Sequence, residues 1–208
     1  MSVAAPPDRS GRAAALVVAV GVTCALHIGK LPVAIPVLRD AMGITLLQAG
    51  FLLSLVQMAG MLLGLFVGLA ADRWGPRRVM GIGLCLLSAG SAWGAGANSV
   101  AELLASRALE GFGFLLAVLP APGLLRRLVR EPRLLSRALG WWGAYMPLGT
   151  ALALLFGAPL IDALGWRVVW LLLAATSLAA AVMLRSVARD EAADTPAPIW
   201  GRLRRTLS

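Results

Sequence analysis

The sequence predicts an all-α membrane protein with six transmembrane helices. Hydrophobic residues make up 59% of its 208 residues and charged residues only 14%, against about 25% charged residues in a soluble domain. The apolar residues form long runs near the roughly 20 residues that a spanning helix needs. They lack the polar alternation of barrel strands, so helices alone pair every backbone group in the bilayer. We expect spans at about 13–37, 45–70, 78–97, 101–124, 137–160 and 167–185.

This pattern divides the chain into a six-helix bundle at 13–185, an N-terminal tail at 1–12 and a C-terminal segment at 186–208. Asp190 to Pro198 has the composition of a polar linker. The basic segment from Ile199 predicts the start of an amphipathic helix on the membrane surface.

The basic residues predict the orientation. With the N-terminus inside, 15 of the 19 lysines and arginines fall in cytoplasmic segments, Arg39 and Arg167 fall outside, and Lys30 and Arg107 lie within spans. The positive-inside rule then places both termini in the cytoplasm, and we expect a bacterial inner membrane. The net charge of +9 thus reflects topology, and no nucleic acid partner is expected because stacking aromatics do not accompany the arginines.

Two turns share a short motif. Asp72-Arg-Trp-Gly75-Pro-Arg77 follows span two, and Asp162-Ala-Leu-Gly165-Trp-Arg167 follows span five. A chance match is one explanation. The other is an internal repeat of two three-helix units with inverted topology, because the first turn is predicted inside and the second outside.

The first turn also carries a family resemblance. The signature G-x-x-x-D-R-x-G-x-R-R, found between spans two and three of major facilitator superfamily transporters, is matched by Gly68, Asp72, Arg73, Gly75, Arg77 and Arg78. A span-four signature is matched by Leu103, Arg107, Gly111 and Gly113, with Glu110 in place of the usual Gln. Nearly the whole chain resembles the N-terminal six-helix half of such a transporter.

The resemblance has further implications. The family's motif after span two is thought to latch two halves together on the cytoplasmic side, so this chain would need a second copy, a separately encoded half or the remainder of a longer chain. We expect a fragment. Arg107 to Phe114, with Pro120 and Pro122, weakly resembles the cyanate permease branch. The span-five antiporter signature has Ala153-Leu154 instead of Gly-Pro, which argues against a drug/proton antiporter.

Four ionisable residues lie at predicted membrane depth, where charge is costly and function is the default hypothesis. His27 and Lys30 share one helix face, as do Arg107 and Glu110, because residues three apart are neighbours. A rise of 1.5 Å per residue puts these residues about 9 to 15 Å below the outer surface, so the pairs can meet. We expect a solute and proton pathway. The structural alternatives are an ion pair tying span four to a neighbour, a core histidine and a snorkelling lysine.

Other polar and small residues are weaker candidates. Gln57 and Tyr145 can orient a solute, or can form hydrogen bonds between helices. Gly60, Gly64 and Gly68 on span two predict close helix packing, and Trp141 and Trp142 are predicted interface anchors.

These observations predict a secondary transporter that moves a small solute, an anion by preference, by alternating access. We expect no enzyme activity, cofactor or metal, since no nucleotide loop, metal cluster or triad is present in the sequence. Two alternatives stay open: a multidrug exporter, and a membrane scaffold or assembly partner that transports nothing.

Overall fold

The computed structural model describes residues 8–186, apart from some side chains that include Gln57 in the middle of the second helix. The predicted C-terminal linker lies outside the described residues, as do residues 1–7 of the predicted N-terminal tail. All regular secondary structure in the described part is helical: α1 (Asp8–Met42), α2 (Leu46–Trp74), α3 (Pro76–Ala95), α4 (Val100–Val118), α5 (Ala121–Leu128), α6 (Pro132–Gly143), α7 (Tyr145–Leu164) and α8 (Trp166–Ser186).

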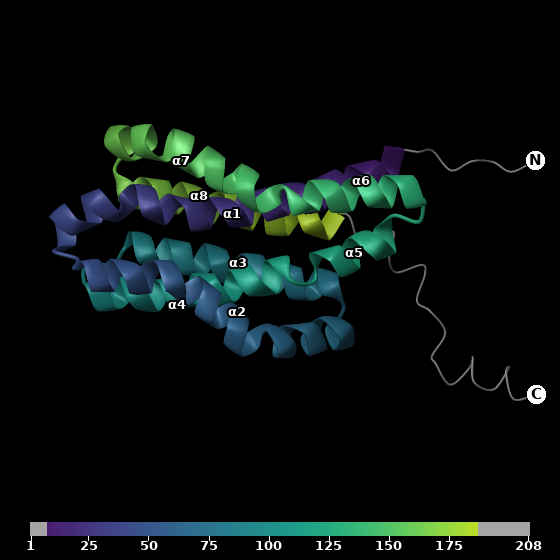
Figure 1. Cartoon of the computed structure of the whole chain (residues 1–208), viewed down its shortest axis with the longest axis horizontal. Coiled ribbons are helices and arrows are strands. Elements are labelled where there is room, and N and C mark those ends of the chain that lie inside the picture. Colours follow the sequence, from purple (N-terminus) through teal and green to yellow (C-terminus); the bar gives the residue numbers. More distant parts are fainter. Residues whose placement is uncertain (1–7, 187–208) are drawn as a thin grey trace, which may run out of the picture.

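The eight helices form six rods, because α4 continues into α5 and α6 into α7 (Figure 1). Each of these two rods, the predicted spans four and five, is interrupted by a break between its two helices. Pro120 follows α4 and lacks the N–H that would continue the helix. At the second break Ala144 bonds back to the Trp141 carbonyl at 3.1 Å, and Pro147 lies in the first turn of α7.

Four rods are long and apolar enough to cross a membrane: α1, α4 with α5, α6 with α7, and α8. The sequences of the other two rods, α2 and α3, explain why they fall short of this criterion of length and apolar composition. At 20 residues α3 is long enough, but it contains glycines, serines and two arginines. In α2 a short apolar stretch, Leu46–Leu55, precedes the side chains that are not described.

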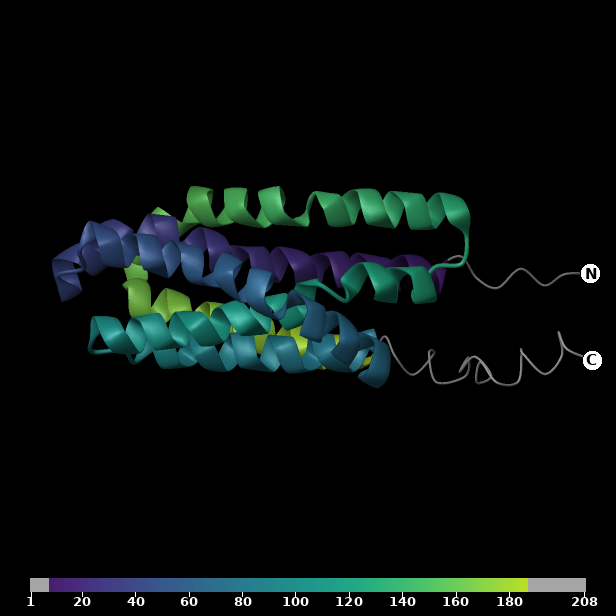
Figure 2. The ribbon, with the colours of Figure 1, turned by 60° about the horizontal axis from the view of Figure 1, so that its bottom comes forward.

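The rods run along one common axis (Figures 1 and 2). One end holds the α1–α2, α3–α4 and α7–α8 connections, and the other holds the α2–α3 and α5–α6 connections. The closest packing joins α3 to α4 and α8, and α1 to α7, while α2 lies on α4. The bundle therefore contains two tightly packed groups, α1 with α7 and α3 with α4 and α8.

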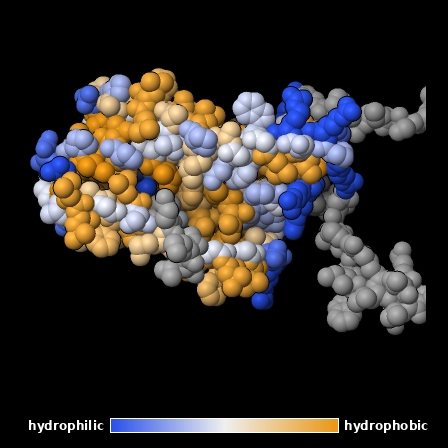
Figure 3. Space-filling model, viewed as in Figure 1, coloured by the Kyte–Doolittle hydropathy of each residue, from blue (hydrophilic) through white to orange (hydrophobic). Residues whose placement is uncertain are grey.

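The arginines are distributed unequally between the two ends of the bundle. The first end carries Arg39 and Arg167, whereas ten described arginines lie at or near the other: Arg12, Arg73, Arg77, Arg78, Arg126, Arg127, Arg130, Arg133, Arg137 and Arg185. In Figure 3 hydrophilic residues gather at this second end, around α5 and α6, and hydrophobic residues cover much of the middle. We call it the arginine-rich end.

The two turns that share a sequence motif also share a backbone geometry. Gly75 has φ 86° and ψ 140°, and Gly165 has φ 80° and ψ 150°, a left-handed region that favours glycine. Each glycine N–H bonds to the carbonyl four residues earlier, Ala71 at 3.0 Å and Ile161 at 2.8 Å. The next helix begins at once in both cases, and the two turns lie at opposite ends of the bundle.

The arginines of the two turns make reciprocal contacts. Arg77, at the start of α3, donates to the Arg185 carbonyl at the end of α8 at 3.3 Å. Arg167, at the start of α8, donates to the Ala95 and Ala97 carbonyls at the end of α3 at 2.7 and 3.0 Å. A cation near a helix C-terminus offsets the negative end of the helix dipole. The end of each helix is thus capped by the start of the other, which agrees with an inverted repeat.

Small residues permit the closest helix contacts, but not at the expected place. A Cβ at Gly83 would lie 2.4 Å from the Ala117 nitrogen, and one at Gly113 would lie 2.5 Å from the Leu87 nitrogen. A Cβ at Gly64 or Gly68 would meet nothing within 4 Å. The prediction of close helix packing at Gly64 and Gly68 on span two was therefore wrong. The close approach of two helices is found between α3 and α4 instead.

We expect Gly83→Ala to destabilise the bundle, because the added methyl forces the α3 and α4 backbones apart. An overpacked core typically loses about 1–3 kcal/mol, which should lower the thermal unfolding midpoint in detergent. Gly140→Ala is the matched control, since its Cβ would meet nothing within 4 Å. Equal midpoints for the two variants would contradict this account of the contact.

Candidate functional site

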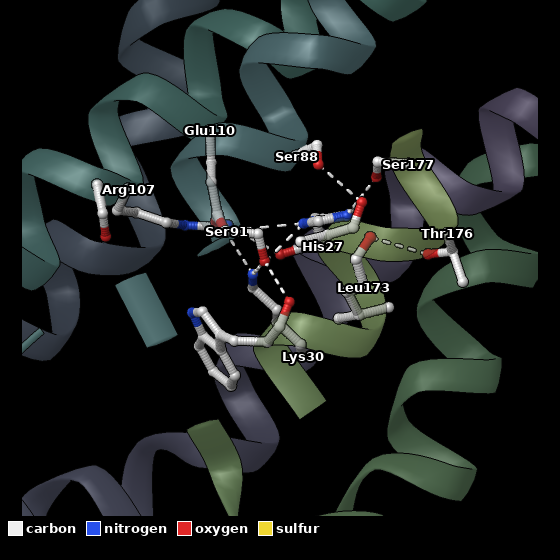
Figure 4. A network of polar contacts seen from close by, with 12 residues as sticks. His27, Lys30, Ser88, Ser91, Arg107, Glu110, Leu173, Thr176 and Ser177 are labelled. Carbon is white, nitrogen blue, oxygen red and sulfur yellow. Dashed lines mark hydrogen bonds and ion pairs between the residues drawn. The ribbon is translucent and has the colours of Figure 1, made fainter. Parts of the chain in front are cut away.

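The predicted ionisable residues meet inside the bundle. His27 and Lys30 extend from α1 and Arg107 and Glu110 from α4, and they converge beside α3 and α8 (Figure 4). Their exposed fractions are 0%, 2%, 3% and 1% in that order. We call these four residues the charged cluster. Charged side chains that are buried this completely are stable only when each charge has a partner.

Glu110 is the centre of the charged cluster. Its Oε1 lies 2.5 Å from Lys30 Nζ, and its Oε2 lies 2.6 Å from Arg107 Nη1. The Nδ1 of His27 is 3.7 Å from Oε1. One carboxylate therefore pairs with a cation from its own helix and with another from α1.

Lys30 contacts three helices besides its own. In addition to Glu110 on α4, its ammonium donates to Ser91 Oγ on α3 at 2.9 Å. It also lies 4.4 Å from the ring centroid of Trp170 on α8, a favourable cation–π arrangement. Ser91 Oγ in turn donates to the Trp170 carbonyl at 2.9 Å. Snorkelling to the membrane surface is excluded in this conformation.

The partners of His27 indicate its tautomer. Nδ1 lies 3.4 Å from Lys30 Nζ, and because an ammonium can only donate, Nδ1 is assigned as an acceptor. Nε2 then carries the proton and donates to Ser177 Oγ on α8 at 2.8 Å. His27 is neutral in this arrangement.

Arg107 ties α4 to the backbones of two other helices. Nη1 donates to the His27 carbonyl on α1 at 2.8 Å, and Nε donates to the Leu52 carbonyl on α2 at 3.3 Å. With its bond to Glu110, the guanidinium links α1, α2 and α4. The described residues contain no buried side-chain polar atom that lacks a partner.

The charges of the cluster sum to +1, from two cations, one carboxylate and a neutral histidine. Protonation of Glu110 would raise this sum to +2 and would leave both Lys30 and Arg107 without a counterion. The arrangement can therefore couple a proton on Glu110 to the binding of an anion by the released cations.

Two other predicted site residues lie elsewhere or are not described. Tyr145 is partly buried and stacks on Trp142 with ring centroids 4.4 Å apart, away from the charged cluster. The side chain of Gln57 lies outside the described residues. Trp142 is 8% exposed and its ring packs against Gly21, so its predicted role as an interface anchor was wrong; Trp141 is 62% exposed.

The predicted latch motif lies apart from the charged cluster, at the arginine-rich end. Asp72 and Arg73 are exposed, and Arg77 contacts the end of α8. Within the described part of the chain the Asp72 carboxylate makes no hydrogen bond or ion pair.

The hydroxyl and aromatic partners of the cluster were not predicted from the sequence. Ser91, Ser177 and Trp170 are buried and contact Lys30 or His27. Ser88 lies one turn before Ser91 and donates to the Ala174 carbonyl at 2.8 Å. The available signal was the pair of serines three apart in an otherwise apolar span, which is common in packed transmembrane helices.

We expect Glu110→Gln to destabilise the fold strongly, because Lys30 and Arg107 would be left buried without a counterion. Losing one partner of a buried ion pair typically costs about 3–5 kcal/mol. The double variant Lys30→Met/Glu110→Gln should unfold at a higher temperature than Glu110→Gln alone, since one unpaired cation is removed with the carboxylate. Additive losses of thermal stability would contradict coupling between these side chains.

Comparison with known proteins supports a transport fold. A family model for the Major Facilitator Superfamily matches residues 13–206. The chain is 34% identical over 124 residues to a puromycin resistance protein of Streptomyces alboniger, covering 59% of this chain and 24% of that protein. It is 33% identical over 97 residues to a multidrug resistance protein of Mycobacterium tuberculosis, covering 47% of this chain and 18% of that protein.

A solved structure agrees with the fold. A bacterial homologue of the human lysosomal transporter Spinster, in an inward-facing and unoccupied conformation, superposes with a TM-score of 0.79 at 16% identity. The match covers 88% of this chain and 44% of that one, so the chain spans less than half the length of this structural neighbour. The family match extends over nearly all of the sequence. The chain belongs to the Major Facilitator Superfamily.

Proposed function

We propose that this chain forms one side of a secondary transporter that moves a small anion together with a proton by alternating access. The observation that carries the proposal is the buried carboxylate of Glu110 shared by Lys30 and Arg107. Ionisable groups at this depth mark ion and proton pathways in membrane proteins.

The need to balance charge would couple the movement of the proton to that of the anion. Protonation of Glu110 would leave Lys30 and Arg107 without a counterion in a low-dielectric interior, where unpaired charge is costly. An anionic solute would restore the balance. His27, which contacts both Lys30 and Ser177, is placed to pass the proton. The proton and the anion would therefore enter and leave together.

The proposal includes an orientation and a partner unit. The arginine-rich end faces the cytoplasm by the positive-inside rule. A second six-helix unit completes the path, either from a longer chain, from a separate chain or from a second copy. The exposed apolar surface of α2, with Leu65 and Phe66 74% and 65% exposed, suits burial against such a unit or lipid. The resemblance of span four to the cyanate permease branch favours a small inorganic anion.

Export of drug-like compounds is the second candidate. Support comes from the relatives, which are described as puromycin, multidrug and methylenomycin A resistance proteins. Against it stands Ala153, where the antiporter signature has glycine. Ala153 packs against α1, so that a Cβ at Gly29 would lie 2.5 Å from its methyl. The scaffold alternative requires no charged cluster.

Flux in proteoliposomes tests the proposal. We expect uptake of radiolabelled cyanate, faster when the outside is acidic, and we expect Glu110→Gln to lose this response to the gradient. Glu102→Gln is the control, because Glu102 lies on the same helix but is exposed, near its start. Folding of each variant is checked by size-exclusion chromatography.

Other results of the flux assay point elsewhere. Ethidium flux without anion flux favours drug export. No flux of either compound by folded protein favours either the scaffold or a chain that requires its second six-helix unit. Anion flux with an unchanged gradient response in Glu110→Gln rejects Glu110 as the coupling residue.

The predicted latch is tested at Asp72. We expect Asp72→Asn to lower transport while membrane insertion and thermal stability stay unchanged, because the exposed carboxylate has no described partner within the chain. Asp162→Asn is a matched control at the equivalent position of the inverted repeat. Undiminished uptake by Asp72→Asn, or equal loss in both variants, would count against a latch at this end.

A further inference from the structure

A groove of about 630 Å³ lies between α3 and α8 at the arginine-rich end. Three arginines contribute to its lining: Arg77, Arg78 and Arg185. Further along, its lining is apolar or small, including Ile82, Cys85, Leu86, Ala181 and Leu184. The segment from Arg78 to Cys85 spans about 10 Å of helix. The groove thus changes from charged to apolar along the axis of the bundle.

The apolar part of the groove has a closed floor and an open side. Ala181 and Leu184 are 4% and 1% exposed, whereas Ile82 is 47% exposed and Cys85 is also exposed. At Gly81 an added Cβ would meet nothing within 4 Å, so no neighbouring helix fills this stretch. An apolar chain lying here would contact both helices.

The arginines retain unused hydrogen-bond donors. Arg77 donates to the Arg185 carbonyl at 3.3 Å, which occupies one of its five N–H groups. In the described residues the side chains of Arg78 and Arg185 make no hydrogen bond or ion pair. Among the described residues the lining contains no carboxylate. Three guanidinium groups at one opening, with no counterion in the described part of the chain, favour an anionic ligand.

The inverted repeat provides an internal comparison. Arg167 corresponds to Arg77, yet it donates to the Ala95 and Ala97 carbonyls and to Asn98 Oδ1. It also lies 4.5 Å from the ring centroid of Trp166. Arg167 thus donates three hydrogen bonds, whereas Arg77 donates one. More donors are therefore left unused at the arginine-rich end.

We propose that this groove binds one anionic phospholipid from the adjacent leaflet. The phosphate pairs with Arg77, Arg78 and Arg185, since guanidinium groups match phosphate oxygens in geometry and charge. One acyl chain lies along Ile82, Cys85 and Leu86. Clustered basic residues at a membrane surface are a recognised attraction for anionic lipids, and the apolar bed below them distinguishes this site from a purely electrostatic surface.

Lipid retention and thiol protection test the site together. The full chain in detergent receives phosphatidylglycerol and phosphatidylcholine in equal amounts, and native mass spectrometry counts the lipids retained. We expect one phosphatidylglycerol, preferred by about fivefold for each arginine that contributes. Cys85 reports the location through its rate of alkylation by N-ethylmaleimide, because the other cysteine, Cys24, is fully buried. Phosphatidylglycerol should slow this reaction and phosphatidylcholine should not.

The decisive variant is Arg78→Gln/Arg185→Gln, in which both side chains are exposed and folding should persist. It should lose the lipid preference and the protection of Cys85. Arg133→Gln removes an exposed charge outside the groove at the same end and should retain both.

Five results would overturn the proposal. Four are equal retention of the two lipids, equal loss in Arg133→Gln, unprotected Cys85 when phosphatidylglycerol is bound, and protection by glycerol phosphate alone. The last would indicate a site for a soluble anion. Protection that emerges only after Asp190→Asn/Glu191→Gln/Asp194→Asn would also reject the lipid, because the groove would belong to the chain's own acidic segment.

Discussion

One carboxylate buried in an apolar bundle must keep its two cations, and this requirement fixes how four helices meet. Glu110 accepts from Lys30 on α1 and Arg107 on α4, while the same lysine and His27 reach serines on α3 and α8. A slip of α1 by one residue along α4 would separate Lys30 from Glu110 and expose each charge to hydrocarbon at a cost of several kcal/mol. The charged cluster therefore sets the register between α1 and α4.

The inverted repeat accounts for the matching geometry of the two turns and makes a difference between them visible. The same glycine geometry ends α2 and α7, and α3 and α8 cap each other through Arg77 and Arg167. The two turns differ in the number of hydrogen-bond acceptors that lie near Arg77 and near Arg167. Asn98 and Trp166 complete the surroundings of Arg167, whereas the other turn adds arginines instead. The two ends of the bundle therefore share a backbone geometry but differ in the side chains that surround the turn arginine.

The ionisable residues of the charged cluster could be predicted from the sequence, because burying a charge is costly. The serines beside them could not, because a buried serine is common. The depth estimate placed His27, Lys30, Arg107 and Glu110 near one another, because helical rise is constant and four ionisable residues in spans are rare. Ser91 and Ser177 gave no comparable signal, since a serine in a span has many uses. Helical spacing shows that a helix has a small-residue face but not which neighbour meets it. Close packing was therefore expected on α2 and is found between α3 and α4.

The position of the charged cluster between two tightly packed groups has a mechanical consequence for the proposed transport cycle. Gly29 and Gly149 let α1 and α7 approach closely, as Gly83 and Gly113 do for α3 and α4, so each pair resists internal sliding. Lys30 and His27 cross from the first group to the second. In the proposed cycle a proton on Glu110 would weaken the ionic bond between the groups and leave the packing inside each group unchanged. Movement should then occur between α1–α7 and α3–α4–α8 as rigid units, with the carboxylate as the element that holds or releases them.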